Sequence, residues 1–379
     1  MDDTTAAIVV GTYHMPGQTF VNRHIQHLFG GRTCVVANTV TGNPYDKPVF
    51  DRGTFTGTPG WKAAAPFRRT LLRLREGTGN IPYGAEKASI KRFLRDNGVS
   101  VILSEFGTKA ILMTDIAQEL SLPIFTYFRG SDASYELGKS RRRQSYARMM
   151  PRLSGVVAVS RFLLDNLAAH GLTHPNSHVI PSGVDTRRFT PGRKTPRSYL
   201  AVGRMVPKKS SLLTLRAFAE ATRDAPDASL RFIGDGPDRA RAQALAHELG
   251  VADRVRFDGA QPHDVVRDAL ATSQVFLQHS VTAADGNTEG QPTAIQEALA
   301  AGCLVIATRH AGIPEIVEHG VNGWLCDEHD VDTYTGLIRD ALDADCASMA
   351  RAARHTAETR LDNAMLLTRL EQVLKGSPP

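Results

Sequence analysis

Short apolar runs alternate with longer helical patterns along most of the chain. In the first part the runs are AAIVVG (6–11), TCVVANT (33–39), VSVILS (99–104), LPIFTYF (122–128) and GVVAVS (155–160). The alternation restarts with SYLAVG (198–203), SLRFIG (229–234), QVFLQ (274–278) and LVIAT (304–308). Each run is rich in β-formers and bounded by turn or polar residues, which predicts parallel sheets covered by helices.

A segment rich in Pro, Gly and basic residues, PSGVDTRRFTPGRKTPR (181–197), separates the two series and marks a domain boundary. We expect one doubly wound domain over residues 1–185 and a second over residues 186–355, facing one another across a cleft. A helical segment at 356–379 is expected to return to the first domain. In such sheets ligands bind at the carboxyl ends of the strands.

Composition narrows the function only a little. The 379 residues are 42% hydrophobic and 22% charged, which suits two ordinary folded domains. The formal net charge of +6 is too small and too dispersed to indicate nucleic acid binding. It fits an anionic ligand or an anionic membrane surface equally well.

The cysteines and the N-terminus indicate the compartment. Cys34, Cys303, Cys326 and Cys346 form no CxxC pair and no zinc spacing, so we expect reduced thiols in a cytoplasmic protein. The start, MDDTTAAIVVG, carries acids where a signal peptide has basic residues. No apolar run approaches the roughly 20 residues that span a bilayer.

The stretch EGQPTAIQEALAAG (289–302) joins two glutamates to an apolar helix pattern. Pro292 is expected as the first helical residue, where its missing N–H costs nothing. Glu297 then lies one turn beyond Thr293, and Glu289 lies in the loop before the helix. A helix start attracts anions, and a carboxylate beside it suits hydroxyl donors. This pattern predicts a ligand that carries both phosphate and hydroxyl groups.

A second anion-binding pattern follows the strand at the start of the second series. AVGRMVPKKS (201–210) turns at Gly203 and presents Arg204, Lys208 and Lys209. Arginine supplies a planar fork and lysine a point charge, which together suit a pyrophosphate. Basic residues in a solvated loop are the alternative.

Two glycine-containing turns are weaker signals. GDGPDR (234–239) is not the dinucleotide fingerprint, because that motif needs glycine where Arg239 stands. Gly17, between the first strand and an apparent helix, could let the backbone approach a ligand. An ordinary turn glycine explains it equally well.

We expect no metal and no other cofactor. His14, His24 and His27 have no carboxylate cluster or second histidine pattern near them in sequence. The Asp-x-Asp motif of Asp343 and Asp345 falls in an apparent helix and indicates a solvated helix face rather than a diphosphate-bridging ion site.

Two basic segments leave membrane contact open. FRRTLLRLR (67–75) alternates arginines with apolar residues, and SRRRQ (140–144) adds a second cluster. A basic amphipathic helix can lie on anionic lipid. A surface helix that turns its apolar side to the core explains the first segment too.

Several blocks together resemble glycosyltransferase family 4, retaining enzymes of the GT-B fold. They are VIPSGVDTRRF (179–189), AVGRMVPKKS, the segment from GDGPDR onward, and EGQPTAIQEALAAGCLVIATRHAGIPEIVEHGVNGWL (289–325). They stand in the family's order. HMPGQTFV and FRGSDAS most resemble bacterial exopolysaccharide transferases of the colanic acid and amylovoran type.

The resemblance implies roles on the donor side. Glu289 would contact the donor sugar and Glu297 the ribose hydroxyls, while Arg204 and Lys209 would neutralise the diphosphate leaving group. Gly17 would approach the phosphates. The backbone that would line the sugar pocket belongs to Gly290, Gln291, Pro292 and Thr293.

The acceptor side departs from the family pattern. Many members have histidine where this chain has Arg129, and related sequences often read Ser-Glu-Thr-Phe where this chain reads Gly17-Gln18-Thr19-Phe20. Gln18, Arg129 and Asp132 are assigned to the acceptor side, whose ligand stays open.

The implied function is metal-independent, retaining transfer of a hexose from a nucleoside diphosphate sugar, UDP-linked rather than GDP-linked. The acceptor would be a glycan or a lipid-linked glycan in polysaccharide or glycoconjugate biosynthesis, at the cytoplasmic membrane face. Two alternatives stay open: a GT-B sugar-nucleotide epimerase or phosphorylase, and a non-catalytic nucleotide-sugar-binding subunit of a transferase complex.

Overall fold

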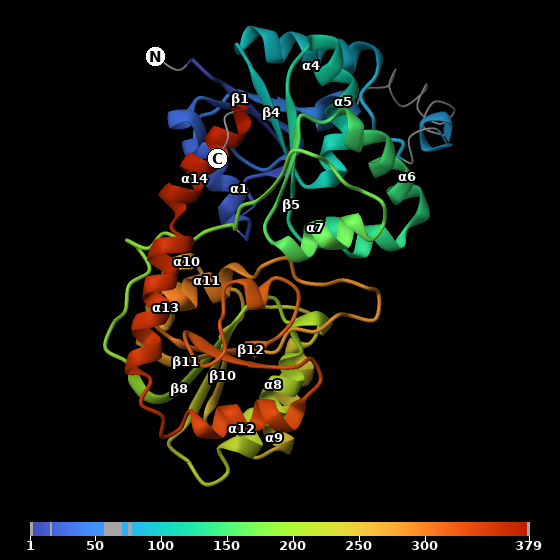
Figure 1. The fold of residues 1–379 in the computed structure, drawn as a ribbon. Helices are drawn as coiled ribbons and strands as arrows, with labels where there is room; N and C mark the ends of the chain where they lie inside the picture. The colour runs from blue at the N-terminus through green and yellow to red at the C-terminus, as the bar shows by residue number, and fades with distance from the viewer. Residues whose placement is uncertain (1–2, 16, 57–69, 75–77, 377–379) are drawn as a thin grey trace. The chain divides into compact units, whose positions relative to one another are not determined.

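The chain forms two compact units (Figure 1). The computed structural model describes residues 3–15, 17–56, 70–74 and 78–376. Unit 1 comprises Met1–Ile180 and Leu367–Pro379, and unit 2 comprises Pro181–Leu366. Of the basic segment at 67–75, residues 67–69 and 75 lie outside the described part.

Unit 1 is built on a seven-stranded parallel sheet of order β3-β2-β1-β4-β5-β6-β7. Its strands are β1 (Ala6–Tyr13), β2 (Thr33–Val40), β3 (Val49–Asp51), β4 (Val101–Glu105), β5 (Ile124–Phe128), β6 (Gly155–Ala158) and β7 (Ser177–Val179). Its helices are α1 (Thr19–His27), α2 (Arg52–Thr56), α4 (Gly84–Asp96), α5 (Gly107–Leu120), α6 (Ser140–Met149) and α7 (Arg161–Ala168). β4 and β5 are buried along their whole length, as expected for strands covered on both faces.

Unit 2 is built on a six-stranded parallel sheet of order β10-β9-β8-β11-β12-β13. Its strands are β8 (Thr195–Val202), β9 (Ser229–Ile233), β10 (Val255–Phe257), β11 (Ser273–Gln278), β12 (Leu304–Thr308) and β13 (Gly323–Cys326). Its helices are α8 (Ser211–Ala221), α9 (Arg239–Glu248), α10 (His263–Thr272), α11 (Thr293–Ala300), α12 (Val331–Asp340) and α13 (Ala347–Arg360).

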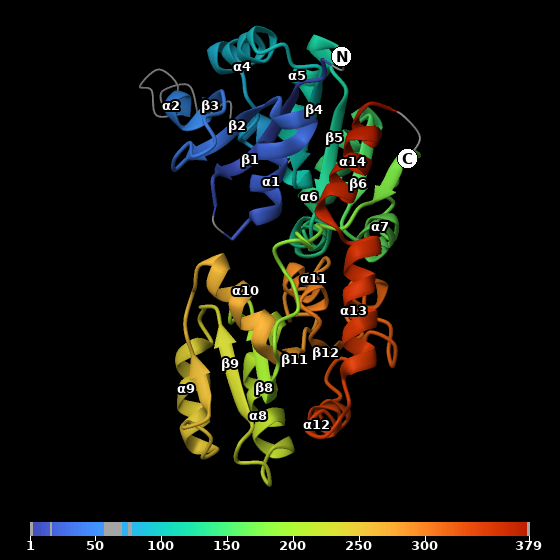
Figure 2. The same cartoon turned by 90° about the vertical axis from the view of Figure 1, so that its left-hand side faces the viewer.

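The core of unit 2 has two layers, one on each face of its sheet (Figure 2). Leu200 packs with residues of α10, α11 and α13, whereas its neighbour Tyr199 packs with residues of α8, α9 and α12. Successive side chains of a strand point to opposite faces, so one strand serves both layers. The predicted doubly wound architecture is therefore confirmed.

The segment between the two series is ordered within unit 2. Val184 N donates to Leu361 O at 2.8 Å, and Asn363 N donates to Val184 O at 2.9 Å. Gly183 has φ +78°, and a Cβ there would lie 2.5 Å from Asn363 Oδ1, so glycine is required. Residues 195–197, expected in this segment, belong to β8.

Helix α14 (Asn363–Leu374) is the last helix that the structure describes. It begins in unit 2, and its residues from Leu367 onward belong to unit 1. There the carboxylate of Glu371 accepts a hydrogen bond from Phe29 N at 2.5 Å, and Leu370 and Val373 are buried. The last helix is therefore part of the folded core of unit 1.

Candidate functional site

The candidate donor residues of unit 2 meet at one edge of its sheet. The chain winds from β8 outward through β9 to β10, and from β11 outward through β12 to β13. β8 and β11 are neighbours, so the winding reverses between them. The crevice outside the carboxyl ends of the strands at such a reversal is the usual ligand site of an open parallel sheet.

The turn after β8 is held by close backbone packing. A Cβ on Gly234 would lie 1.9 Å from Gly203 O, and one on Gly236 would lie 2.3 Å from Met205 O. Met205 N also donates to Asp235 O at 2.9 Å. The GDG sequence, a weak signal by itself, thus supports the turn that carries Arg204.

The cations of this turn surround hollows at the sheet edge. Arg204 is exposed and lines one hollow together with Lys209 and Gln278, and a second with Lys208 and Asn287. Lys208 Nζ also donates to Thr288 O at 2.9 Å. The structure therefore brings together the three basic residues singled out in the sequence.

Glu289 lies beside two of these cations. Its Oε1 atom is 3.3 Å from Lys209 Nζ and 3.6 Å from Lys208 Nζ. Burial by itself would raise the pKa of Glu289, but Lys209 and Lys208 outweigh it and hold the pKa below its ordinary value. The side chain is an ionised carboxylate at neutral pH. Burial also lowers the pKa of Lys208.

Helix α11 begins one residue later than predicted. Pro292 has φ −62° and ψ +124° and is the N-cap, so the first helical residue is Thr293 rather than Pro292. No side chain caps this end. The N–H groups of the first turn therefore have no cap partner within α11 and can face an anion.

The residues around the helix start are fixed from several sides. Gly312 N donates to Gly290 O at 3.0 Å. The buried Gln291 turns its side chain to Gln296 Nε2, 3.1 Å away, and Gln296 Oε1 accepts from Gly183 N. Gly290, Gln291 and Thr293 can therefore offer a ligand their backbone more readily than their side chains.

Glu297 is buried and has a partner that the sequence analysis missed. Its Oε1 atom is 2.9 Å from His263 Nε2, on the first residue of α10. The residues between Glu289 and Glu297 form the end of the loop before α11 and the first turn of that helix. Glu289 lies in the loop before α11 and Glu297 lies within the helix, as the spacing predicted.

His310 and Glu328 were also missed. Each follows a buried strand, β12 or β13, at its carboxyl end. His310 Nε2 is 3.0 Å from Glu289 N, and His310 Nδ1 is 2.6 Å from Glu328 Oε1. The available signal was positional, because polar residues directly after buried parallel strands reach the ligand edge of a sheet.

Unit 1 contains Gly17, which was assigned to the phosphates, and the three residues assigned to the acceptor side. Gly17 is an exposed turn residue with open space where a Cβ would be, and Gln18 is the half-buried N-cap of α1. Arg129 and Asp132 are buried after β5.

Arg129 and Asp132 belong to one polar network. Arg129 Nε and Nη2 donate to Glu105 Oε2 at 3.0 and 2.8 Å, and His24 Nδ1 lies 2.6 Å from Glu105 Oε1. The guanidinium carbon of Arg129 lies 3.5 Å from the centre of the Tyr127 ring. Asp132 accepts from the backbone N–H groups of Arg129, Gly130 and Gly107. These two side chains are tied up inside unit 1.

Metal and membrane features were searched within the described ranges. There, no group of three or more His, Cys, Asp or Glu side chains is arranged to hold a metal ion. Asp343 and Asp345 lie in the turn between α12 and α13, not in the expected helix, and Asp343 pairs with Arg197. Asp345 Oδ1 accepts a hydrogen bond from Ala347 N, the first residue of α13, and this bond favours a turn before α13 over a continuous helix. No described helix is long and apolar enough to cross a bilayer.

Two families match the sequence. One, described as "Glycosyltransferase Family 4", matches residues 30–188, and the other, "Glycosyl transferases group 1", matches residues 185–359. The amylovoran biosynthesis glycosyltransferase AmsK of Erwinia amylovora is 27% identical over 256 residues, which are 66% of this chain. The chain spans 63% of the length of that relative.

A second relative matches over more of its length. The GDP-mannose-dependent alpha-(1-6)-phosphatidylinositol monomannoside mannosyltransferase of Mycobacterium tuberculosis (strain H37Rv) is 34% identical over 344 residues, 84% of this chain and 88% of the relative. Among solved structures, Anabaena Alr3699/HepE in complex with UDP-glucose superposes with a TM-score of 0.75 at 18% identity. That match covers 98% of this chain and 99% of the Anabaena chain. The resemblance noted in the sequence is confirmed: the chain belongs to the family 4 glycosyltransferases and has their GT-B fold of two Rossmann-like units.

Proposed function

We propose that this glycosyltransferase moves a hexose from a nucleoside diphosphate sugar to a glycan or lipid-linked acceptor, with retention of configuration and without a metal ion. The reaction would serve polysaccharide or glycoconjugate biosynthesis at the cytoplasmic face of a membrane. The sugar–diphosphate bond breaks, the acceptor oxygen bonds to the same sugar carbon from the leaving-group face, and the hydroxyl proton passes to the departing diphosphate.

The observation that carries the proposal is the unsatisfied state of Glu289. Its buried Oε1 atom makes no hydrogen bond, although Lys208 and Lys209 lie within ion-pair distance. A buried polar atom without a partner is costly, and a sugar hydroxyl donating to this oxygen would remove that cost. The lysines would then be available to a diphosphate.

The surrounding groups suit the charge that develops during transfer. Positive charge builds on the sugar next to the Glu289 carboxylate, and negative charge builds on the diphosphate next to Arg204, Lys209 and the uncapped N-terminus of α11. Charges and dipoles fixed in advance stabilise such a transition state. In this proposal Glu297 binds the ribose hydroxyls, the backbone of Gly290–Thr293 lines the sugar pocket, and Gly17 lies near the phosphates.

For the donor we propose a UDP-sugar first. Support comes from the shared fold of the Anabaena protein that was solved with UDP-glucose. A GDP-sugar is the second candidate, because the mycobacterial relative at 34% identity is named as GDP-mannose-dependent. Thermal stabilisation by UDP, GDP, ADP and TDP, compared in wild type and Glu297→Ala, separates them. A nucleotide at about 100 times its Kd adds about 2.7 kcal/mol of stability.

For the acceptor we propose a molecule that carries a phosphate, as lipid-linked glycans do. Lys109, in the first turn of α5, lies against the end of β1, because a Cβ on Gly11 would be 3.3 Å from its Nζ. Within the described residues the side chain of Lys109 makes no hydrogen bond or ion pair. Burial, Arg52 and Arg142 lower its pKa. An anion would complete this cationic group, so Lys109→Gln should raise the KM of a phosphate-bearing acceptor and spare a neutral one.

The decisive experiment measures acceptor-dependent sugar transfer by the purified chain. Lys209→Ala should lower turnover by about 10²-fold or more, and Glu289→Gln should lower it as well. Arg216→Ala, which removes one exposed cation from α8, is the matched control and should transfer at the wild-type rate. Wild-type rates in both Lys209→Ala and Glu289→Gln would refute the site assignment.

The same assay separates the alternatives. An epimerase would convert the sugar nucleotide without any acceptor, and a phosphorylase would consume inorganic phosphate. A non-catalytic binding subunit would be stabilised by a nucleotide and would transfer nothing to any acceptor. Slow hydrolysis without acceptor and fast transfer with it are the results expected of a transferase.

A further inference from the structure

His310 holds the backbone of Glu289 in a way that fixes the state of its own ring. Glu289 N donates to His310 Nε2 at 3.0 Å. A backbone N–H can only donate, so Nε2 must be the acceptor and carry no proton. The remaining proton of a neutral ring then sits on Nδ1, where it is donated to Glu328 Oε1 at 2.6 Å. This assignment follows from the hydrogen-bond network.

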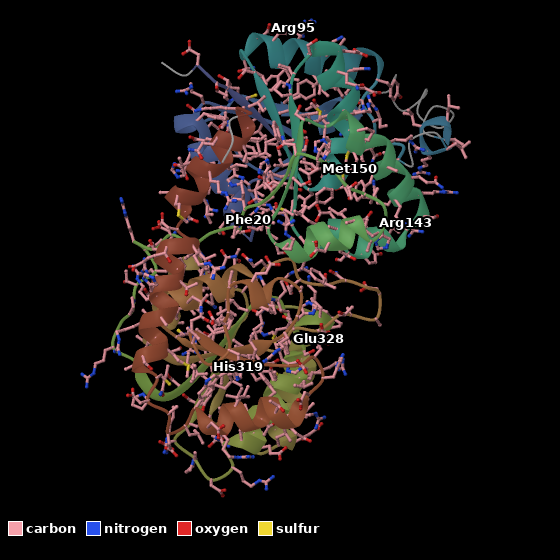
Figure 3. The ribbon with its side chains drawn as sticks, in the orientation of Figure 1. Phe20, Arg95, Arg143, Met150, His319 and Glu328 are labelled. Carbon is pink, nitrogen blue, oxygen red and sulfur yellow. The ribbon has the colours of Figure 1, made fainter. Side chains whose placement is uncertain are left out.

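Glu328 is itself anchored from a third loop. Its Oε2 atom accepts from Thr282 N at 2.7 Å, in the segment after β11. Burial would raise the pKa of Glu328, but its hydrogen bonds from His310 and Thr282 outweigh this and lower it. Figure 3 labels Glu328, which follows β13. A series of hydrogen bonds from Thr282 through Glu328 and His310 to Glu289 therefore links the ends of β11, β13 and β12 to the loop before α11.

Several titratable groups surround the ring of His310. The side chain is 1% exposed, and its neighbours are Glu328 at Nδ1, the Glu289 carboxylate and His279. Burial lowers the pKa of His279 to about 4, so that ring adds no positive charge at neutral pH. Lys208 and Lys209 pair with the Glu289 carboxylate, and their Nζ atoms lie 3.6 and 3.3 Å from its Oε1 atom.

We propose that His310 is a positioning residue for Glu289, and that Glu328 sets the ring tautomer, proton on Nδ1, in which it can act. This rests on the proposed function, in which Glu289 contacts the donor sugar. A proton on Nε2 would place two N–H donors against each other. The hydrogen bond would then be lost, and Glu289 and the start of α11 would no longer be held together with Lys209.

The first test needs no turnover. In protein labelled with ¹⁵N-histidine, the ring nitrogens of His310 are assigned by comparison with His310→Gln. Nδ1 should appear as the protonated nitrogen and Nε2 as the bare one at neutral pH. Glu328→Gln should abolish that preference. A protonated Nε2 in the wild type overturns the proposal, whatever the enzyme is found to transfer.

The second test is rescue of transfer by a conservative substitution. Glutamine has a carbonyl oxygen to accept from Glu289 N and an amide N–H₂ to donate to Glu328. His310→Gln should therefore keep kcat/KM within about threefold of wild type. His310→Ala should lower kcat by about tenfold to a hundredfold, because it leaves the part-buried N–H of Glu289 without its partner.

His319 provides a matched control in the same unit. Its Nδ1 also accepts a backbone N–H, that of Leu325, at 2.9 Å, and in the described part of the chain it shares no hydrogen bond or ion pair with Glu289. His319→Ala should therefore keep kcat within about threefold of wild type. A loss in His310→Gln as large as that in His310→Ala, or wild-type kcat in His310→Ala, overturns the proposal.

Failure of the proposed function and failure of the positioning role of His310 give different results. If the protein transfers no sugar to any acceptor, the proposed function fails, while the ¹⁵N spectra still decide the tautomer. If it transfers sugar and Glu289→Gln is impaired, but the His310 variants behave like those of His319, the function stands and the positioning role falls.

Discussion

Two glutamates of this chain, the buried Glu105 and the half-buried Glu289, differ in how closely their carboxylates are paired. Glu105 receives two hydrogen bonds from Arg129 and pairs with His24 at 2.6 Å. Glu289 sits 3.3 Å or more from two ammonium groups and has an oxygen with no hydrogen bond. A carboxylate that is already satisfied has little to offer a ligand, whereas a loosely held one can change partners when a ligand arrives.

This contrast predicts a large stability cost at Glu105. Glu105→Gln leaves the Arg129 guanidinium buried without its counter-charge, which costs about 3–5 kcal/mol in comparable pairs. Chemical denaturation of wild type and variant measures the difference. Lys91→Gln is the control, because its exposed pair with Glu119 contributes only about 0–1 kcal/mol. Equal losses in both variants would contradict the structural role of Glu105.

The same pair predicts how acid acts on unit 1. Burial would raise the pKa of Glu105, but Arg129 and His24 lower it to about 2 from an ordinary 4.5. A depressed carboxyl pKa gives stability that is present above pH 4.5 and is lost as the pH falls toward 2. Denaturation profiles between pH 5 and 2 should therefore show a loss in wild type that is absent in Glu105→Gln.

At the residue scale the sequence analysis singled out the charged residues that are proposed for the donor side, but not the residues that hold them in place. Arg204, Lys209, Glu289 and Glu297 stand in recognisable local blocks. Gln296, His263 and His310 act through partners 21 to 113 positions away, which no local pattern encodes. The network around Arg129 likewise joins His24, Glu105 and Arg129, which lie far apart in the sequence, so no local pattern encodes it.

At the scale of elements, the central strands were predicted and the edges were not. Each of the nine apolar runs contains a strand. The strands without an expected counterpart are β3, β7, β10 and β13, which are the outermost strands of the two sheets. Edge strands are covered on fewer sides, and these have only three or four residues, so their apolar pattern is too short to stand out.

Close packing between two turns of unit 2 predicts that the turn after β8, which carries Arg204, is sensitive to a substitution at Gly234. Gly234→Ala would place a Cβ 1.9 Å from Gly203 O and must displace the β8 turn that carries Arg204. We expect lower stability together with weaker nucleotide binding, seen as a smaller thermal shift. The control is Gly336→Ala in α12, where nothing lies within 4 Å. Alanine there should stabilise the helix by up to about 1 kcal/mol. Unchanged nucleotide binding in Gly234→Ala would show that the turn tolerates the shift.

At the scale of the whole molecule, unit 1 is built from two separate parts of the chain, one before and one after unit 2. Unit 1 is completed only when α14 has been made, because Leu370, Val373 and the Glu371 hydrogen bond to Phe29 belong to it. The sequence analysis expected a helical segment at 356–379 that returns to the first domain. Which residues it anchors depends on Phe29, 342 positions earlier, and so only the folded structure supplies that.

The surface of unit 1 predicts peripheral binding to anionic membranes. Residues 70–74 are helical, and Leu71 and Leu74 are 55% and 74% exposed. Leu71 and Leu74 therefore do not pack into the core, whereas Leu72 between them is half-buried. Burying each side chain in lipid would gain about 1.5–3 kcal/mol, and nearby arginines would add attraction to anionic headgroups.

Vesicle sedimentation measures this binding. Wild type should bind vesicles with 30% phosphatidylglycerol better than pure phosphatidylcholine, and less well in about 1 M salt, where the Debye length falls to about 3 Å. The double variant Leu71→Gln/Leu74→Gln should bind about tenfold or more weakly. Val321→Gln, which replaces an exposed apolar residue of unit 2, is the control and should bind as wild type does. Equal loss in both variants would mean that binding is not located on unit 1. Equal binding to neutral and anionic vesicles would remove the electrostatic part of the prediction, because the arginines would then contribute nothing measurable.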